Sequence, residues 1–264
     1  GTGRMTEDAC IIGMFRSGSN FLRALLERNY ACRIGYNSFG WKHGLFPIIA
    51  GGAAMRMPGT PTITLTKNPF SAIASLHRYY LGNGRNLVSG GGAEMGDFLR
   101  APLVIRDDAN PESAELFFPT VADCWVAMTW NVMSIVGRRP ASRHLRYEDL
   151  VADPEGQAAR LAGALGLARV SQVFDVPRGR MRNLPGRAVD WQREETEMNR
   201  PFGPSSVCNH AYMAAFSEAD CAFVLSRLPV ALLERTGYDA LVRDLAATGT
   251  SERATHGEPN EQTA

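Results

Sequence analysis

The sequence predicts an α/β fold around a mostly parallel central sheet. Two short runs, ACIIGM at 9–14 and TITLT at 62–66, are apolar or β-branched, as buried strands are. Each run is followed by a segment with helical periodicity, and strands that alternate with helices are typical of a parallel sheet covered by helices. The chain shows no internal repeat and no linker, so we expect one domain over residues 5–248.

The first half of the chain contains two strand–helix pairs. The first strand leads into an amphipathic helix over 20–30. The second leads into a helix that begins at Asn68-Pro69 and runs to about residue 80, with proline where its missing N–H costs nothing. The glycine-rich stretch 82–92 is predicted to be a surface loop.

The second half predicts three further helices and one strand. Residues 120–136 form a long apolar helix, and residues 143–147 form the third strand. Asp153-Pro154 begins a helix that ends at Gly166, and Ser217-Glu218 caps a last helix to about residue 236.

Three segments do not fit this alternation. Residues 177–208 hold six arginines and four prolines, and a long irregular segment inside a domain is usually functional or disordered. The polar residues 249–264 are expected to be a disordered tail. Residues 1–4, before Met5, are expected to be a tag remnant.

The composition excludes several classes of protein. Hydrophobic residues make up 45% and charged residues 21%, which excludes disorder and collagen-like repeats. The net charge of +1 offers no general attraction to nucleic acid or to a membrane surface, so a bound anion needs a local site. The five cysteines form no CxxC pair, and no signal peptide or membrane span is evident, so we expect a reducing, cytoplasmic location without a zinc module.

The first strand–helix turn, Gly13 to Asn20, has the form of an anion site. Backbone N–H groups and the positive end of the helix dipole point at one spot there. The Gly13–Gly18 spacing is that of the phosphate loop GxxxxGK[ST], but Ser19 replaces its lysine and Asn20 its Mg²⁺-binding hydroxyl. Arg16 supplies the positive charge instead. The alternative is an ordinary helix start with an incidental arginine.

A second turn strengthens the first interpretation. Lys67 ends the strand at 62–66, and Ser75 lies eight residues later in the following helix. Only two of the 28 basic residues are lysines, Lys42 and Lys67. Two such turns at neighbouring strand ends would hold two anionic groups of one ligand, because ligands of open α/β sheets bind at the carboxyl ends of the strands.

Several segments of the chain, beginning with these two turns, resemble motifs of a known protein family. FRSGSNFL at 15–22 resembles the 5′-phosphosulfate loop of sulfotransferases that use 3′-phosphoadenosine-5′-phosphosulfate (PAPS), and its RSGS core is close to the carbohydrate sulfotransferase form. TKNPFSAIASLHRYY is similar to their 3′-phosphate motif RNPxDxxxS. LRYEDLVADPEGQAARLAGALGL and AAFSEADCAFVLSRLPVALLERTGYD resemble two later blocks, in order, up to Tyr238. The resemblance implies a P-loop-NTPase-like three-layer fold.

The resemblance also implies roles for individual residues. The 5′-phosphosulfate would be held by five consecutive loop residues, Arg16, Ser17, Gly18, Ser19 and Asn20. The 3′-phosphate would be bound by Lys67 and Ser75, and Arg200 would close over it, although Arg178 to Arg200 also reads as a solvated charge run. Phe21 would stack on adenine and Tyr147 would lie near the cofactor. For each of these two residues, packing in the core is the alternative interpretation.

His43 is the candidate general base, because the family carries a KTHLP segment near this point of the chain and histidine can accept a proton near neutral pH. The alternative is a packing histidine. Lys42 is adjacent to His43 rather than two residues before it, so either Lys42 is not the family's lysine or the backbone bends there. His77 and His210 are reserve candidates, and His144 is expected to be structural.

These features predict a PAPS-dependent sulfotransferase, of the kind found in natural-product biosynthesis. It would move a sulfuryl group to a hydroxyl of a small molecule or glycan, with an amine as the less favoured acceptor. The transfer would need no metal, and neither a nucleic acid nor a membrane is expected as a partner. Two alternatives remain: a P-loop kinase-like phosphotransferase, and a non-catalytic nucleotide-binding protein.

Overall fold

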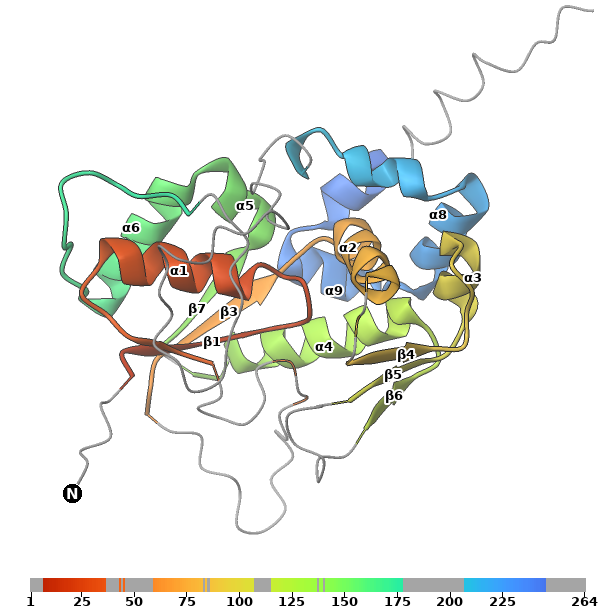
Figure 1. Cartoon of the computed structure of the whole chain (residues 1–264), viewed down its shortest axis with the longest axis horizontal. Helices are drawn as coiled ribbons and strands as arrows, with labels where there is room; N and C mark the ends of the chain where they lie inside the picture. The colour runs from red at the N-terminus through yellow and green to blue at the C-terminus, as the bar shows by residue number, and fades with distance from the viewer. Residues whose placement is uncertain are drawn as a thin grey trace, which may run out of the picture. The chain divides into compact units, whose positions relative to one another are not determined.

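The computed structural model describes residues 7–36, 43, 45, 59–82, 84, 86–106, 115–136, 138–139, 141–177 and 207–245. Its strands and helices are drawn in Figure 1. The chain divides into two compact units, one of Gly1–Lys67 with Ala127–His210 and one of Asn68–Val126 with Ala211–Ala264. The expectation of one domain over residues 5–248 stays a prediction.

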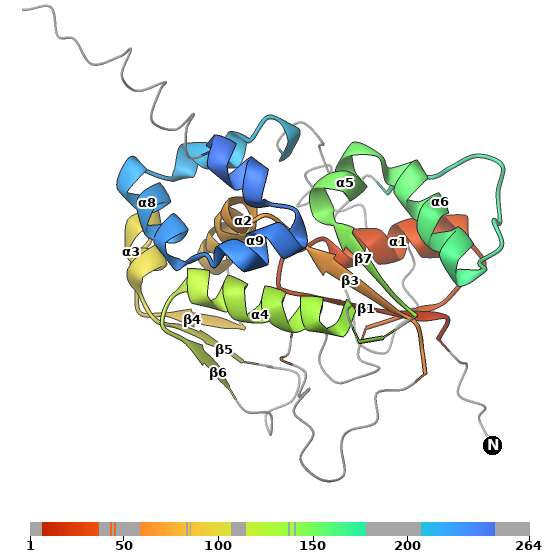
Figure 2. The same cartoon turned by 180° about the vertical axis from the view of Figure 1, so that it is seen from behind.

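The first unit contains a parallel sheet of four strands. These are β1 (Ala9–Gly13), β2 (Ile34–Gly35), β3 (Thr62–Thr66) and β7 (Ser142–Arg146), in the order β2-β1-β3-β7. Every pairing is parallel, and Figure 2 shows β1, β3 and β7 side by side. The predicted α/β class with a mostly parallel sheet is confirmed.

Helices pack on both faces of this sheet, because alternate residues of β1 point to opposite sides. Ala9 and Ile11 join a core cluster with α1 (Ser19–Asn29), α5 (Tyr147–Ala152) and α6 (Pro154–Leu165). Cys10 and Ile12 pack with Val132 and Ile135, in the second half of α4 (Val121–Val136). All five residues of β1 are buried, as a strand covered on both faces requires.

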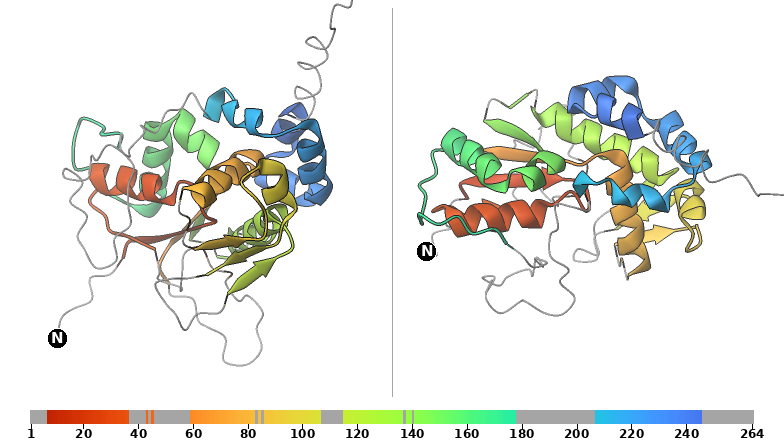
Figure 3. Two further views of the ribbon diagram at one scale, coloured as in Figure 1. Left: turned by 45° about the vertical axis from the view of Figure 1, so that its right-hand side comes forward. Right: turned by 90° about the horizontal axis from the view of Figure 1, so that it is seen from above.

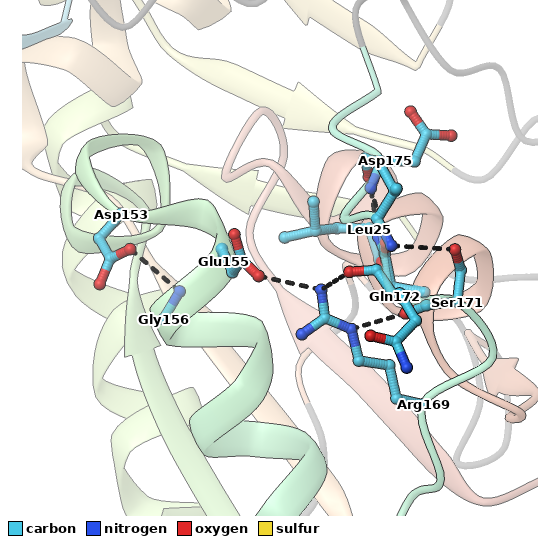
Figure 4. Close-up of polar contacts among 10 residues, drawn as sticks. Leu25, Asp153, Glu155, Gly156, Arg169, Ser171, Gln172 and Asp175 are labelled. Carbon is cyan, nitrogen blue, oxygen red and sulfur yellow. Dashed lines mark hydrogen bonds and ion pairs between the residues drawn. The ribbon is translucent and has the colours of Figure 1, made fainter.

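The segment after α6 is fastened to α1 and α6 by polar contacts (Figure 4). Arg169 binds the Glu155 carboxylate at 3.0 Å and donates to the Ser171 carbonyl at 2.8 Å. The Asn29 side chain accepts from the Asp175 backbone N–H at 2.7 Å and donates to its carbonyl at 2.8 Å. These contacts fix the chain path between Gly166, where α6 ends as predicted, and residue 177.

The second unit combines a small antiparallel sheet with helices. The sheet has the order β4-β5-β6, from β4 (Leu87–Ser89), β5 (Leu103–Ile105) and β6 (Leu116–Phe118). The left view of Figure 3 shows these strands in yellow-green. The helices of this unit are α2 (Pro69–Leu81), α3 (Met95–Arg100), the 3₁₀ helix η1 (Ala211–Ala215), α8 (Glu218–Arg227) and α9 (Val230–Thr236).

Two predictions about this unit are wrong. The glycine-rich stretch 82–92 is not all loop, because it contains β4, which pairs with β5. The predicted last helix is two helices: Ser217 caps α8 in a capping box with Asp220, but the chain is extended at Leu228-Pro229 before α9 begins. Proline cannot donate a helical hydrogen bond in the interior of a helix, which explains the break.

Candidate functional site

The candidate site of the first unit is the turn between β1 and α1. Arg16 has φ 63° and Gly18 has φ 91°, so two residues of this turn are left-handed. The buried Ser17 hydroxyl donates to the Met14 carbonyl at 2.8 Å. The turn is therefore closed by its own serine, and Gly18 is the N-cap of α1.

Both glycines of the turn allow close packing. A Cβ on Gly13 would lie 2.7 Å from the Leu65 carbonyl oxygen and from the Ser17 hydroxyl. A Cβ on Gly18 would run into ring atoms Cδ2 and Cε2 of Tyr147. The left-handed φ of Gly18 also disfavours any other residue. The predicted glycine spacing thus has a direct steric cause.

The start of α1 has the elements of an anion site. The first N–H groups of a helix lack intrahelical acceptors, and the helix dipole adds partial positive charge there. Arg16, two residues before the N-cap, is half-buried. The Tyr36 hydroxyl donates to the Ser19 carbonyl at 3.2 Å, which ties the chain after β2 to this first turn.

Lys67 brings a second cation to this turn. It follows β3 directly and is only 5% exposed. Its Nζ donates to the Arg16 carbonyl oxygen at 3.5 Å and lies 4.6 Å from the centre of the Tyr147 ring. A buried ammonium needs such polar and aromatic neighbours to offset its lost hydration. Lys67 therefore contacts the β1–α1 turn through the Arg16 carbonyl.

Tyr147, which directly follows β7, is also part of this cluster. It is the first residue of α5, after Arg146 as N-cap, and its ring packs against Gly18 and contacts the ammonium of Lys67. Burial, with a smaller contribution from Glu148, raises the pKa of Tyr147 to about 12 against an opposing effect of Arg16. Its phenol is therefore neutral at physiological pH.

His43 contacts the same turn from a different segment. Its Nδ1 lies 2.7 Å from the carbonyl oxygen of Gly13. Its ring stacks on Phe15, with centroids 4.3 Å apart and planes 20° apart. The structure therefore brings together Arg16, Ser17, Gly18, Ser19, Lys67, Tyr147 and His43 around one turn.

The other histidines have different surroundings. His77 lies in α2, and its Nε2 is 2.8 Å from the Ala93 carbonyl oxygen. His144 lies in β7, with Nε2 2.9 Å from the Thr66 hydroxyl. Burial, and then the nearby Arg146 cation, lowers the pKa of His144 to about 4, so it is neutral at physiological pH. His210 has φ 53° and is half-buried.

Two further predicted ligand residues, Ser75 and Phe21, are both buried. Ser75 is 8% exposed and belongs to α2 in the second unit. Phe21 is 2% exposed and lies in the core cluster beneath α1 with Leu22 and Leu25. This is the position of a core residue, and the contact of Phe21 with adenine stays a prediction.

Two further predicted residues, Lys42 and Arg200, lie outside the described residues. Sequence reasoning missed Phe15, although it lies within the predicted loop, because its role depends on a tertiary contact with His43. Among the described residues, no group of three or more His, Cys, Asp or Glu side chains is arranged to hold a metal ion. No helix in the described ranges is both long and apolar enough to cross a membrane.

Comparisons of the chain with protein-family models, with curated proteins and with solved structures find no match. The functional interpretation therefore depends on the residues of the site and on the motif resemblance.

Proposed function

We propose that this chain is a PAPS-dependent sulfotransferase with a P-loop-like fold, active in the cytoplasm on a hydroxyl of a small molecule or glycan. One observation carries the proposal. The β1–α1 turn has a left-handed Arg16 and the buried ammonium of Lys67 beside it, but it has Ser19 and Asn20 where nucleotidases carry Lys and Ser or Thr. Such a turn suits an anion held by cationic side chains and a helix N-terminus.

The proposed reaction is a direct in-line transfer. The acceptor oxygen attacks the sulfur of PAPS, a new S–O bond forms, and the bond between sulfur and the 5′-phosphate oxygen breaks. The acceptor proton moves to His43, and 3′-phosphoadenosine-5′-phosphate (PAP) leaves with the bonding electron pair. Arg16 and the N-terminus of α1 stabilise the charge that develops on the leaving phosphate.

We assign Lys67 to the 5′ end of the donor, because its ammonium contacts the Arg16 carbonyl oxygen and the Tyr147 ring. This differs from the role that the motif resemblance implies, in which Lys67 binds the 3′-phosphate. Ser75 and Arg200 keep that role as predictions. Both cations near the turn then serve the leaving group.

The two alternative functions make different demands on the same turn. A P-loop phosphotransferase needs Mg²⁺ and a loop lysine, and Ser19 and Asn20 offer neither that lysine nor the usual metal-binding hydroxyl. A non-catalytic nucleotide-binding protein needs the turn but not a proton acceptor. The position of His43 against Gly13 and Phe15 favours a catalytic protein over that second alternative.

The proposal is tested by measuring PAP formed from PAPS by chromatography, with water and with a panel of phenols and sugars as acceptors. We expect turnover that excess EDTA leaves unchanged and that His43→Ala lowers by about 10²–10⁴-fold, the usual effect of losing a general base. Turnover that is lost in EDTA and restored by Mg²⁺ would favour the P-loop phosphotransferase over the sulfotransferase. PAP binding without turnover on any acceptor would favour the non-catalytic protein.

A further inference from the structure

We infer that Phe15 and the carbonyl of Gly13 hold His43 as the tautomer whose Nε2 accepts the proton, so that the donor-binding turn also orients the base. This inference deepens the proposed function and rests on it for its catalytic meaning. Its structural content, the protonation state of each ring nitrogen, can be measured without any turnover.

The hydrogen bond fixes which nitrogen carries the proton. A backbone carbonyl can only accept a hydrogen bond, so at 2.7 Å from Gly13 O the Nδ1 of His43 must donate. In the neutral imidazole the lone pair is then on Nε2, at the far side of the ring from Gly13. A general base takes up the acceptor proton at such a lone pair.

The aromatic contact fixes the plane of the ring. Phe15 is 6% exposed, and its ring is nearly parallel to His43 at a centroid distance of 4.3 Å. The hydrogen bond alone would still allow the plane of the imidazole to tilt through small changes of the side-chain torsions. Stacking on a buried neighbour removes that freedom, so the direction of Nε2 is set by the turn itself.

This arrangement also supports the protonated state. When Nε2 takes the acceptor proton, the imidazolium keeps its Nδ1–H bond to Gly13, which becomes charge-assisted and therefore stronger. Gly13 and Phe15 belong to the turn that contains Arg16. Phe15 is therefore a positioning residue, since it acts on the reaction through His43.

The chain contains an internal reference for the measurement. In His77 the nitrogen bonded to a carbonyl is Nε2, at 2.8 Å from Ala93 O, so its lone pair is on Nδ1. His43 and His77 should thus be opposite tautomers in one molecule. A long-range ¹⁵N–¹³C correlation spectrum of histidine-labelled protein distinguishes the two, and His43→Asn and His77→Asn variants assign the signals.

We expect the His43 spectrum to show a protonated Nδ1 and an unprotonated Nε2 at a pH where the ring is neutral, with His77 reversed. A lone pair on Nδ1 of His43, or a mixture of both tautomers, would overturn the inference. Since the spectrum needs neither donor nor acceptor, this result is independent of whether the protein transfers a sulfuryl group.

The role of Phe15 is tested by paired variants. Phe15→Tyr keeps the stacked ring, whereas Phe15→Leu keeps an apolar side chain without it. An unstacked ring can tilt away from the Gly13 carbonyl and weaken the bond that sets the tautomer, so we expect Phe15→Leu to produce a mixture of His43 tautomers. It should also lower kcat for PAP formation by about 2- to 10-fold, the range of one aromatic pair. PAP affinity should stay within about twofold, and Phe15→Tyr should restore both readouts.

Unchanged tautomer and kcat in Phe15→Leu would contradict the positioning role, and so would an equal loss in Phe15→Tyr. A protein that releases no PAP while the spectrum is as expected would overturn the proposed function and leave the tautomer assignment standing. The two failures are therefore distinguishable.

Discussion

The ammonium of Lys67 lies 4.6 Å from the centre of the Tyr147 ring, and the same ring packs against Gly18. This contact joins the carboxyl ends of β3 and β7 to the turn that follows β1. Each of the three parallel strands therefore contributes one part of the candidate site. The arrangement explains why so buried a lysine is tolerated there, since its charge faces an aromatic ring and a backbone carbonyl.

Replacing Lys67 with methionine should weaken nucleotide binding at the 5′ end. The change keeps a flexible apolar side chain but removes a charge-assisted contact worth about 1.5–3 kcal/mol, which corresponds to roughly 10- to 100-fold in Kd. Calorimetric titration should show this loss for PAP and for AMP alike, because both carry a 5′-phosphate.

Arg169→Met is the matched control for this experiment. It also removes a cation lying over a ring, at 5.6 Å from Phe174, but far along the sequence from the turn. We expect it to leave nucleotide affinity unchanged. A loss in Lys67→Met that is confined to PAP would instead assign Lys67 to the 3′-phosphate.

Gly18→Ala should destabilise the protein. Its Cβ would meet the Tyr147 ring at a left-handed φ of 91°, and each of these costs free energy. We expect the free energy of unfolding to fall by about 2 kcal/mol or more, as overpacking and backbone strain usually cause. Urea denaturation followed by circular dichroism measures it.

Gly163→Ala is the opposite case in the same unit. Gly163 is exposed in α6, where a Cβ would meet no atom within 4 Å. The substitution should raise the free energy of unfolding by up to about 0.8–1 kcal/mol, the difference in helix propensity. Equal effects of the two alanine substitutions would contradict the packing described for Gly18.

Two substitutions of Arg16 should differ in their effect on stability but not in their effect on PAP binding. Its left-handed backbone costs roughly 1–2 kcal/mol in a non-glycine residue. Arg16→Gly should therefore be more stable than Arg16→Ala by about 0.5–1 kcal/mol. This difference is smaller than the strain itself because glycine has greater conformational entropy in the unfolded chain. Both variants should bind PAP about 10- to 100-fold more weakly, because both lack the guanidinium. An Arg16→Ala variant that binds PAP normally would remove Arg16 from the site.

His144 should make stability depend on pH between about 4 and 6.5. Its folded pKa is lowered from 6.5 to about 4, so in this window the unfolded chain binds more protons than the folded one. Stability should be fully present above pH 6.5 and should be lost progressively as pH falls toward 4. Unfolding temperatures measured across this range should fall less steeply in His144→Gln. An identical slope in the variant would show that other groups cause the loss.

The sequence was sufficient for those elements whose signals are local. Strand β3 occupies the predicted residues 62–66, and α6 begins and ends at the predicted Asp153 and Gly166 caps. The sheet of the second unit was missed because β4, β5 and β6 have three residues each, too few to show a periodicity. The short strand β2 was missed for the same reason.

The site was predictable in part for a similar reason. The β1–α1 turn follows from glycine spacing and from a strand followed by a helix, which are local features. The stack of Phe15 on His43 and the contact of Lys67 with Arg16 join residues that are 28 and 51 positions apart. No spacing rule encodes such contacts, so only the fold could show them.

We propose that the β1–α1 turn binds the nucleotide of PAPS without a metal. The decisive experiment is calorimetric titration of the wild-type protein and of Arg16→Ala with PAP, AMP and ADP, each in EDTA and in Mg²⁺. We predict that PAP binds at least tenfold more tightly than AMP or ADP, equally well in EDTA and Mg²⁺, and that Arg16→Ala loses most of this affinity. Tighter binding of ADP that requires Mg²⁺, or no binding of PAP, would contradict the claim.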